Sequence, residues 1–255
     1  MIPLRDILPT RRRPVVTWAI ISLNAAVWIV EVFHPSGTEA VVERWGMTPA
    51  LFFTEPGPRT FLTPFTSMFM HGGWLHVIGN MWFLWIFGDN VEDAFGRVRF
   101  AAFYVVGGLA AALLQFAVSM GSGVPMVGAS GAIASVLAAY LCFYPHARVQ
   151  TLIFLFFLIR IVEIPAFIFI FAWFGFQLLS GCTSLAVQTG TAWWAHIGGF
   201  VVGYLVARWW RGRLAREGRS LPATTGGLFT FHVHRRGDRI PPPDDLMPPG
   251  GGRDP

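Results

Sequence analysis

The chain has 255 residues, of which 54% are hydrophobic and only 13% are charged. Soluble domains carry a charge on roughly a quarter of their residues, so this composition excludes an ordinary soluble domain and is typical of a membrane protein. The net charge of +5 does not indicate a nucleic-acid-binding protein, because the arginines lie between and beyond the apolar segments, where membrane topology explains them. Cys142 and Cys182 have neither the spacing of a metal site nor that of a disulfide framework.

Six segments are apolar and long enough, or nearly so, to cross a bilayer as helices. In chain order we place them at 14–33, 74–91, 100–120, 129–144, 164–180 and 192–210. The stretch from 151 to 181 is too long for one span and too short for two, and Arg160 and Glu163 interrupt it. Because charges inside a membrane are costly, we expect 147–163 to lie at the membrane interface. The expected fold is therefore an all-α bundle of six transmembrane helices.

The arginines indicate the orientation of these helices. Arginines precede the first span and follow the second, fourth and sixth, whereas the loops 121–128 and 181–191 hold no charged residue. Positive residues gather on the cytoplasmic side, so we expect both termini to be cytoplasmic. Composition then divides the chain into a cytoplasmic segment 1–13, a membrane domain 14–211 and a disordered cytoplasmic tail 212–255.

Polar side chains gather at one depth in the expected bundle. The second, fourth and sixth spans all begin on the outer side. His76 and Asn80 lie four residues apart, and therefore on one face, at the start of the second span. Ser130 lies in the first turn of the fourth span and His196 about one turn into the sixth. All four side chains are thus expected within roughly 10 Å of the same membrane face, which indicates a site open to the outside.

Small residues recur every four positions on two of these helices. The stripes are Gly131, Ser135 and Ala139 on the fourth span, and Ala195, Gly199, Gly203 and Ala207 on the sixth. Such stripes let helix backbones approach closely in lipid. If the two stripes face each other, His196 comes within hydrogen-bonding distance of Ser130 and can act as its base. His76 and Asn80 can then donate hydrogen bonds to an oxyanion, each worth about 3 kcal/mol.

At these residues the sequence resembles the rhomboid family of intramembrane serine proteases. Gly128-Ala129-Ser130-Gly131 resembles the GxSG motif of that family, and "AHIGGFVVG", with Gly199 and Gly203, resembles its AHxxGxxxG motif. "HGGWLHVIGNM" is similar to the signature of its second helix. The resemblance covers about residues 14–210. It implies a Ser130–His196 catalytic dyad, His76 and Asn80 in the oxyanion hole, and helix-packing glycines at 128, 131, 199 and 203.

The same resemblance implies the partners and the location. The protein is expected to be a multi-pass protein of a bacterial plasma membrane, to need no metal or cofactor, and to cleave transmembrane or juxtamembrane segments of other membrane proteins. Substrate would reach the site beside the fifth helix and the loop after it, and loop 34–70 would lie partly in the outer leaflet. One departure is Ala134, because some members carry an aromatic residue there that stacks on the catalytic histidine.

Other interpretations stay open at this point. A lone serine in a transmembrane helix is usually a packing residue, and a lone histidine is more often structural than catalytic. We expect a structural role for His71, just before the second span, and interface snorkelling for Glu31. The chain can also be a catalytically silent relative that binds transmembrane clients, or a small transporter, although the inner halves of the polar helices are apolar. Neither the substrate nor the oligomeric state follows from the sequence.

Overall fold

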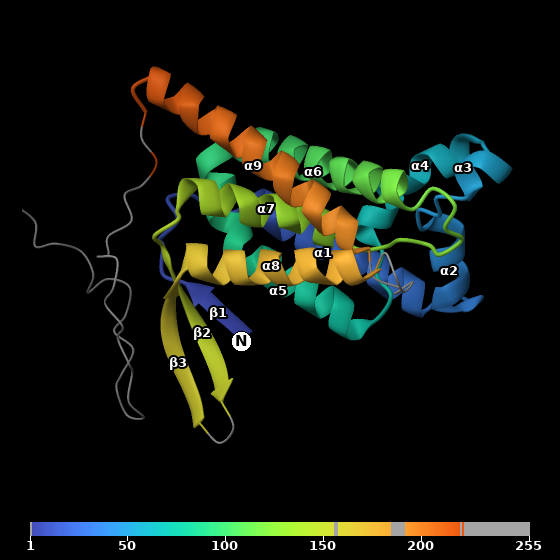
Figure 1. The fold of residues 1–255 in the computed structure, drawn as a ribbon, viewed down its shortest axis with the longest axis horizontal. Coiled ribbons are helices and arrows are strands. Elements are labelled where there is room, and N and C mark those ends of the chain that lie inside the picture. The colour runs from blue at the N-terminus through green and yellow to red at the C-terminus, as the bar shows by residue number, and fades with distance from the viewer. Residues whose placement is uncertain (1, 156–157, 185–191, 220, 222–255) are drawn as a thin grey trace, which may run out of the picture.

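Long helices lie side by side along the molecule, and a small β-sheet projects from one end of them (Figure 1). The computed structural model describes residues 2–155, 158–184, 192–219 and 221. Its elements are β1 (Ile2–Asp6), α1 (Val15–Val32), α2 (Gly37–Trp45), α3 (Leu51–Thr54), α4 (Pro58–Thr66), the 3-10 turn η1 (Ser67–Phe69), α5 (Trp74–Phe95), α6 (Arg97–Val118), α7 (Ser130–Phe143), β2 (Arg148–Leu155), β3 (Leu158–Pro165), α8 (Ala166–Ser184) and α9 (Trp193–Arg216).

Each of the six predicted spans contains a helix, namely α1 and α5 to α9. Among the described residues, two helices, α1 and α6, are both long and apolar enough to cross a bilayer by length and composition. The others are shorter, or they carry polar residues at their ends. The short helices α2, α3 and α4 lie in the connection between α1 and α5, at the end of the molecule opposite the sheet (Figure 1). The chain is thus mostly helical.

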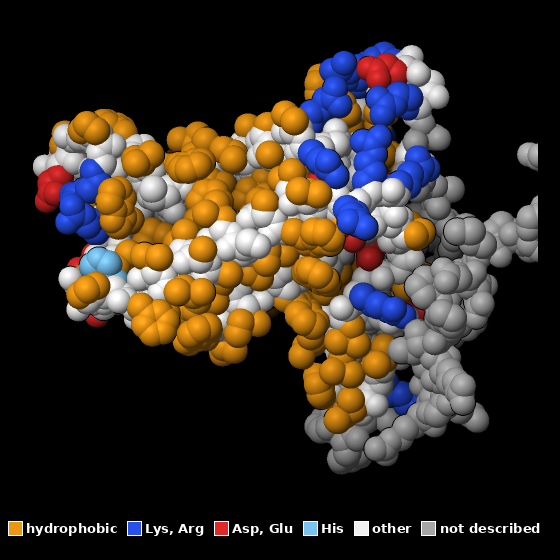
Figure 2. Space-filling view, turned by 180° about the vertical axis from the view of Figure 1, so that it is seen from behind, with side chains coloured by type: hydrophobic (Ala, Val, Ile, Leu, Met, Phe, Trp, Pro, Cys, Tyr) orange, Lys and Arg blue, Asp and Glu red, His pale blue; other side chains and the backbone are white. Residues whose placement is uncertain are grey.

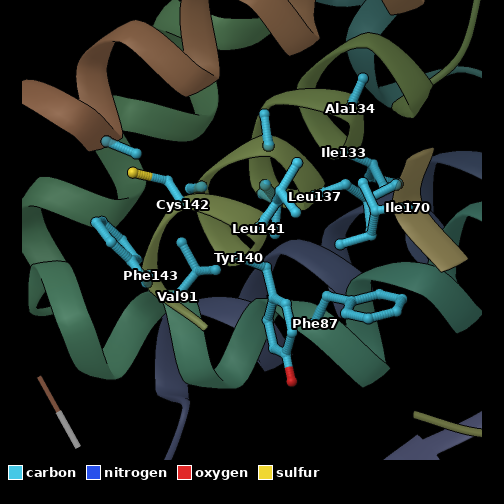
Figure 3. Packing of buried hydrophobic residues seen from close by; sticks show 14 of the residues in the cluster. Phe87, Val91, Ile133, Ala134, Leu137, Tyr140, Leu141, Cys142, Phe143 and Ile170 are labelled. Carbon is cyan, nitrogen blue, oxygen red and sulfur yellow. The ribbon is translucent and has the colours of Figure 1, made fainter. Parts of the chain in front are cut away.

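Helix α7 forms the centre of the bundle. Every residue from Gly131 to Phe143 is buried, which is what a helix with apolar residues on all sides requires. Helices α5, α6, α8 and α9 all contact it. Figure 3 shows its inward packing, in which Tyr140 and Leu137 lie near Phe87 of α5 and Ile170 of α8. The residue that begins this helix, Ser130, is therefore held by the most completely surrounded element of the fold.

The sheet corrects the expectation of an all-α fold. Residues 147–163, which we expected as an apolar interfacial segment, contribute most of an antiparallel hairpin of β2 and β3. Strand β1 pairs antiparallel with β2, which gives the order β1-β2-β3. A run rich in Ile, Leu and Phe is compatible with either helix or strand, and its periodicity alone cannot decide. The pairing with β1 depends on residues about 150 positions earlier in the chain.

Side-chain hydrogen bonds tie the N-terminal strand to the helices. The Asp6 carboxylate accepts hydrogen bonds from the Tyr140 hydroxyl of α7 at 2.7 Å and from Asn90 Nδ2 of α5 at 2.8 Å. The indole Nε1 of Trp82 donates to the carbonyl oxygen of Pro3 at 2.6 Å. The sheet is therefore fixed to α5 and α7 near their C-terminal ends.

The arginines gather at the same end as the sheet. In Figure 2 the arginine side chains crowd this end, around the last turns of α9 and the base of the sheet. Helix α9 continues to Arg216, into the segment predicted as a disordered tail. Residues 222–255 of that predicted tail lie outside the described residues.

Candidate active site

The approach to Ser130 is set by a turn that requires glycine. Gly128 has a φ of +130°, and a Cβ atom at this position would lie 2.8 Å from two ring atoms of His76. Just before it, Met126 and Met47 exchange two backbone hydrogen bonds of 2.8 and 3.0 Å. The glycine thus lets the chain pass directly beside His76, and the connection between α1 and α5 holds the turn from the other side.

Helices α7 and α9 are packed backbone against backbone. A Cβ atom at Gly199 would clash with the carbonyl group of Gly131, and one at Gly203 would clash with the backbone of Ser135. The two small-residue stripes therefore face each other, which is the condition on which the expected contact between Ser130 and His196 depends. This close approach brings the first turn of α7 against the first turn of α9.

The consequence is a short contact between two polar side chains. The Nε2 atom of His196 lies 2.7 Å from the Oγ atom of Ser130. His196 is only 8% exposed, and Ser130 is half-buried. Ser130 is the first residue of α7, where backbone N–H groups lack helical partners and the helix dipole favours negative charge. A hydroxyl beside an imidazole at such a position is arranged as a nucleophile beside its base.

The two remaining predicted residues face the same space. His76 and Asn80 line a cavity of about 490 Å³ together with Ser130 and His196. The backbone N–H of Gly72 donates to Nδ1 of His76 at 3.4 Å, so its Nε2 carries the hydrogen of the neutral ring. The Nδ2 atom of Asn80 is buried and has no hydrogen-bond partner within the described residues. The cavity therefore offers two donors that can bind a negatively charged oxygen.

Two tryptophans flank the ring of His196. The ring centroid of Trp173, on α8, lies 6.1 Å from that of His196, and Trp193, on α9, lies 5.9 Å away at 85°. Ala134, where an aromatic neighbour was considered, is fully buried. Sequence analysis missed both tryptophans. Nothing in the spacing of the chain connects Trp173 of α8 with His196, whereas Trp193 lies three residues before His196 on the same helix, a spacing that was an available signal. An Ala at 134 therefore does not leave the imidazole without aromatic neighbours.

A third missed residue is Gln115 of α6. Its Oε1 accepts a hydrogen bond from the backbone N–H of Ala195 at 3.3 Å, one residue before His196. The same N–H also donates to the carbonyl of Ala192 at 3.1 Å, so the Gln115 amide shares this donor and fixes α6 to the first turn of α9. An isolated amide in the apolar run 100–120 was the available signal, since a polar side chain within a membrane needs a partner.

His71 supports the site from behind, whereas the expectation for Glu31 is wrong. The Oε2 atom of Glu31 accepts a hydrogen bond from the backbone N–H of His71 at 3.2 Å. Glu31 is only 1% exposed, so its carboxylate does not snorkel to an interface. The rings of His71 and His76 lie 5.1 Å apart, edge to face. The structural role expected for His71 fits this packing against His76.

The remaining chemistry-bearing residues do not extend the site. Within the described part of the chain, no group of three or more His, Cys, Asp or Glu side chains is placed to hold a metal ion. No Asp or Glu is among the described residues that line the cavity. His232 and His234 of the tail lie outside the described residues.

Comparison with known proteins connects this site to a family. A family model described as "Rhomboid domain" matches residues 58–212. Presenilin-associated rhomboid-like protein A, mitochondrial, of Danio rerio is 33% identical over 100 residues, which are 38% of this chain and 26% of that protein. The corresponding human protein gives the same values. RHOMBOID-like protein 6, mitochondrial, of Arabidopsis thaliana is 33% identical over 96 residues, or 36% of this chain and 31% of that protein.

These comparisons correct the expected location. The relatives come from animals and a plant, and their names place them in mitochondria, so the expectation of a bacterial plasma membrane is wrong. The chain spans only between a quarter and a third of the length of these relatives.

Proposed function

The chain belongs to the rhomboid family, and we propose that it is an intramembrane serine endopeptidase that hydrolyses a peptide bond in or next to a transmembrane segment of another protein. The observation that carries this proposal is the 2.7 Å contact between Ser130 Oγ and His196 Nε2, at the wall of a cavity with free hydrogen-bond donors. Nucleophile, base and donors are the parts that acyl transfer requires.

The proposed reaction gives each of the four polar residues a role. Ser130 Oγ attacks the carbonyl carbon of the scissile bond while His196 Nε2 takes the hydroxyl proton. The carbonyl oxygen becomes an oxyanion, which accepts hydrogen bonds from His76 Nε2 and Asn80 Nδ2. His196 then gives the proton to the leaving amine, which leaves an ester on Ser130. Water then attacks the ester carbonyl carbon while His196 takes its proton. The bond from this carbon to Ser130 Oγ breaks, His196 returns the proton to Oγ, and the acyl part leaves as a carboxylic acid.

We also propose that α1 and α5 to α9 all cross the bilayer, with both termini on the arginine-rich side. Successive helices alternate in direction (Figure 1), and large apolar side chains are exposed along the helices that surround α7, for example Ile29 at 55%, Val106 at 51% and Leu205 at 58%. A protein in water would not leave such residues exposed along all of its outer long helices. Exposed Phe53 and Phe61 at the opposite end then fit a connection that dips into the lipid.

We propose that substrate enters between α5 and α8. The cavity is lined on one side by Leu75 and Phe83 of α5 and on the other by Trp173 and Phe176 of α8. A transmembrane segment lying in the bilayer can approach this pair of helices from the side. The proposed partners are thus other membrane proteins, and lipid surrounds the rest of the bundle.

Trp173 and Trp193 act in this scheme as positioning residues. Flat rings packed on an imidazole restrict its rotation, so Nε2 stays directed at Ser130. The task that a residue at 134 performs in some family members is here divided between α8 and α9.

The test is cleavage of a single-span substrate by the purified protein in lipid vesicles. We expect Ser130→Ala and His196→Ala each to lower the rate at least about 10³-fold, because dyad members act as a unit. Ser135→Ala is the matched control, since Ser135 lies on the same helix but its hydroxyl donates to the carbonyl of Ala132 at 2.6 Å. This control is expected to cut at close to the wild-type rate.

A fluorophosphonate probe separates the enzyme from a silent relative that binds transmembrane clients. An activated Ser130 is expected to react with the probe, and Ser130→Ala to lose the label. Folded protein that neither reacts with the probe nor cuts any single-span substrate would rule out the protease and leave the client-binding function.

A further inference from the structure

The three-stranded sheet leaves the helix bundle sideways at the arginine-rich end. Strands β2 and β3 run away from the helices rather than along them, whereas α8 turns back into the bundle directly after β3 (Figure 1). Strand β3 ends at Pro165 and α8 begins at Ala166, so no linker separates the hairpin from the helix. If the long helices cross a membrane, this hairpin lies at the level of one membrane surface.

One face of the sheet is apolar and exposed. Residues that are paired directly across antiparallel strands share a face. Ile2, Leu152 and Ile161 form one row across all three strands, and Phe154 and Ile159 form the next row toward the tip. Ile2 is 45% exposed, Phe154 52% and Ile159 63%. We call these five residues the apolar sheet face.

The same face becomes polar toward its base. Arg5 Nε donates to Gln150 Oε1 at 2.9 Å, and Gln150 Nε2 donates to Glu163 Oε1 at 3.4 Å. Arg148 forms an ion pair with Glu163 at 3.8 Å. Hydrogen-bonding groups therefore hold the base together, and the exposed apolar rows begin immediately beyond them.

The opposite face already has its partner within the fold. Pro3, Val149 and Thr151 are buried on that side, and Trp82 of α5 donates its hydrogen bond to Pro3. On the other face, among the described residues, only the polar base, with Arg148, Gln150 and Glu163, is buried. The apolar sheet face contributes nothing to the core of this chain.

The surroundings of the apolar sheet face indicate what covers it. The helices beside the sheet expose Trp82, Trp85 and Phe171 by 42%, 58% and 57%. Figure 2 shows hydrophobic side chains on the hairpin and on the adjoining helices, with arginines at that end of the molecule. Arg5, which pairs with Gln150 on the same face, is exposed, and Arg160 is exposed on the opposite face. Apolar groups bordered by arginines, at the level where helices leave a bilayer, match the boundary between acyl chains and anionic headgroups.

We propose that the apolar sheet face rests in the lipid leaflet at the arginine-rich end, in contact with the upper acyl chains, with Arg5, on the same face, at the headgroup phosphates. The partner is the lipid surface itself. Because α8 continues directly from β3, this contact anchors the start of α8 at a defined depth. The proposal does not depend on proteolytic activity.

The test measures the depth of single labelled positions in vesicles that contain an anionic phospholipid. Cys142 and Cys182 are first replaced by Ala, and Phe154→Cys and Ile159→Cys are then each labelled with an environment-sensitive fluorophore. Leu205→Cys is the lipid-facing control, since Leu205 is 58% exposed on α9. Ala215→Cys is the aqueous control, because Ala215 is exposed near the end of α9. Quenching by iodide reports contact with water, and quenching by lipids with a doxyl group near the headgroup reports contact with the leaflet.

The labels at 154 and 159 are expected to be quenched by the doxyl lipid, as at 205, and to lose most of the iodide quenching seen at 215. Iodide quenching equal to that at 215 would overturn the proposal, because the face would then lie in water. Protection from both quenchers would overturn it too, because protein would then cover the face. Cysteine-free protein with the wild-type thermal transition confirms that the labelled background is folded.

Discussion

The asparagines at the two ends of α5 differ in their hydrogen bonding. Asn80, at the site end, has a buried amide nitrogen without a hydrogen-bond partner among the described residues, whereas Asn90 donates to Asp6 at 2.8 Å. At the site end, close backbone packing of glycines holds the helices together. At the sheet end, side chains satisfy one another. Of these two asparagines, the one whose donor is left free is the one that the proposed reaction needs, at the cost of a buried unpaired donor.

The largest effect is expected from widening the contact between α7 and α9. In Gly199→Ala the added methyl group meets the backbone of Gly131, so the helices must separate. A displacement of about 1 Å between reacting groups typically lowers the rate by roughly 10²-fold. Gly175→Ala is the matched control, since a Cβ atom there meets nothing within 4 Å. The measurement is kcat/KM for a single-span substrate with a melting curve for each variant, and an unchanged rate in Gly199→Ala would contradict the need for close approach.

The next effect is expected on kcat at Asn80, and Asn90 provides the comparison. Asn80→Ala is expected to lower kcat roughly 10²-fold with little change in KM, because its donor is used in the transition state. Asn90→Ala is expected to leave kcat unchanged and to lower the free energy of unfolding by about 1 kcal/mol through the lost hydrogen bond. Steady-state kinetics and denaturation of both variants check the pair. Equal effects on kcat would show that the two ends do not differ as described.

A smaller effect is expected from the aromatic neighbours of His196. Trp193→Ala is expected to lower kcat about 10-fold by loosening the imidazole, and Trp193→Phe to restore most of the rate. The same order is expected for fluorophosphonate labelling of Ser130. Trp209→Ala, on the exposed side of the same helix, serves as the control. A loss of stability in Trp193→Ala without a change in kcat would assign the residue to packing alone.

The smallest effect is expected on the pH dependence of stability, through Asp6 at the sheet end. Burial raises the pKa of Asp6 from 3.8 to about 8, although its hydrogen bond from Tyr140 acts in the opposite direction. The folded state therefore binds this proton more tightly than the unfolded state, so the contribution to stability is full below about pH 4 and is lost as the pH rises through about 8. The melting temperature is expected to fall across this window, and Asp6→Asn to flatten the fall. A fall that is just as steep in Asp6→Asn would assign it to another group.

Several features of the fold were predictable because they depend on local chemistry. Helix α1 matches its predicted span within a residue at each end, since an uninterrupted apolar run has one stable form in lipid. Ser130, His196, His76 and Asn80 were found because polar residues in such runs are costly and therefore conspicuous. The facing glycine stripes predicted which two helices meet.

Other features depend on pairs that the sequence does not connect. The hairpin of β2 and β3 was expected as an interfacial segment of unspecified form, because its third strand, β1, lies at the other end of the chain. Trp173 and Gln115 reach the site from α8 and α6 only because those helices have one particular rotation about their axes. A membrane helix is apolar on nearly all sides, so the pattern of its hydrophobic residues does not determine that rotation.

By itself, the sequence determined that this is a membrane protein whose polar residues meet at one end. A polar group buried in an apolar chain costs free energy unless it has a partner, so polar residues there indicate either a contact or a functional site. Only the tertiary structure decided which side chains surround His196, which strands pair and which sheet face remains uncovered. Those outcomes follow from contacts between distant segments, whose energies depend on packing geometry rather than on the composition of either segment.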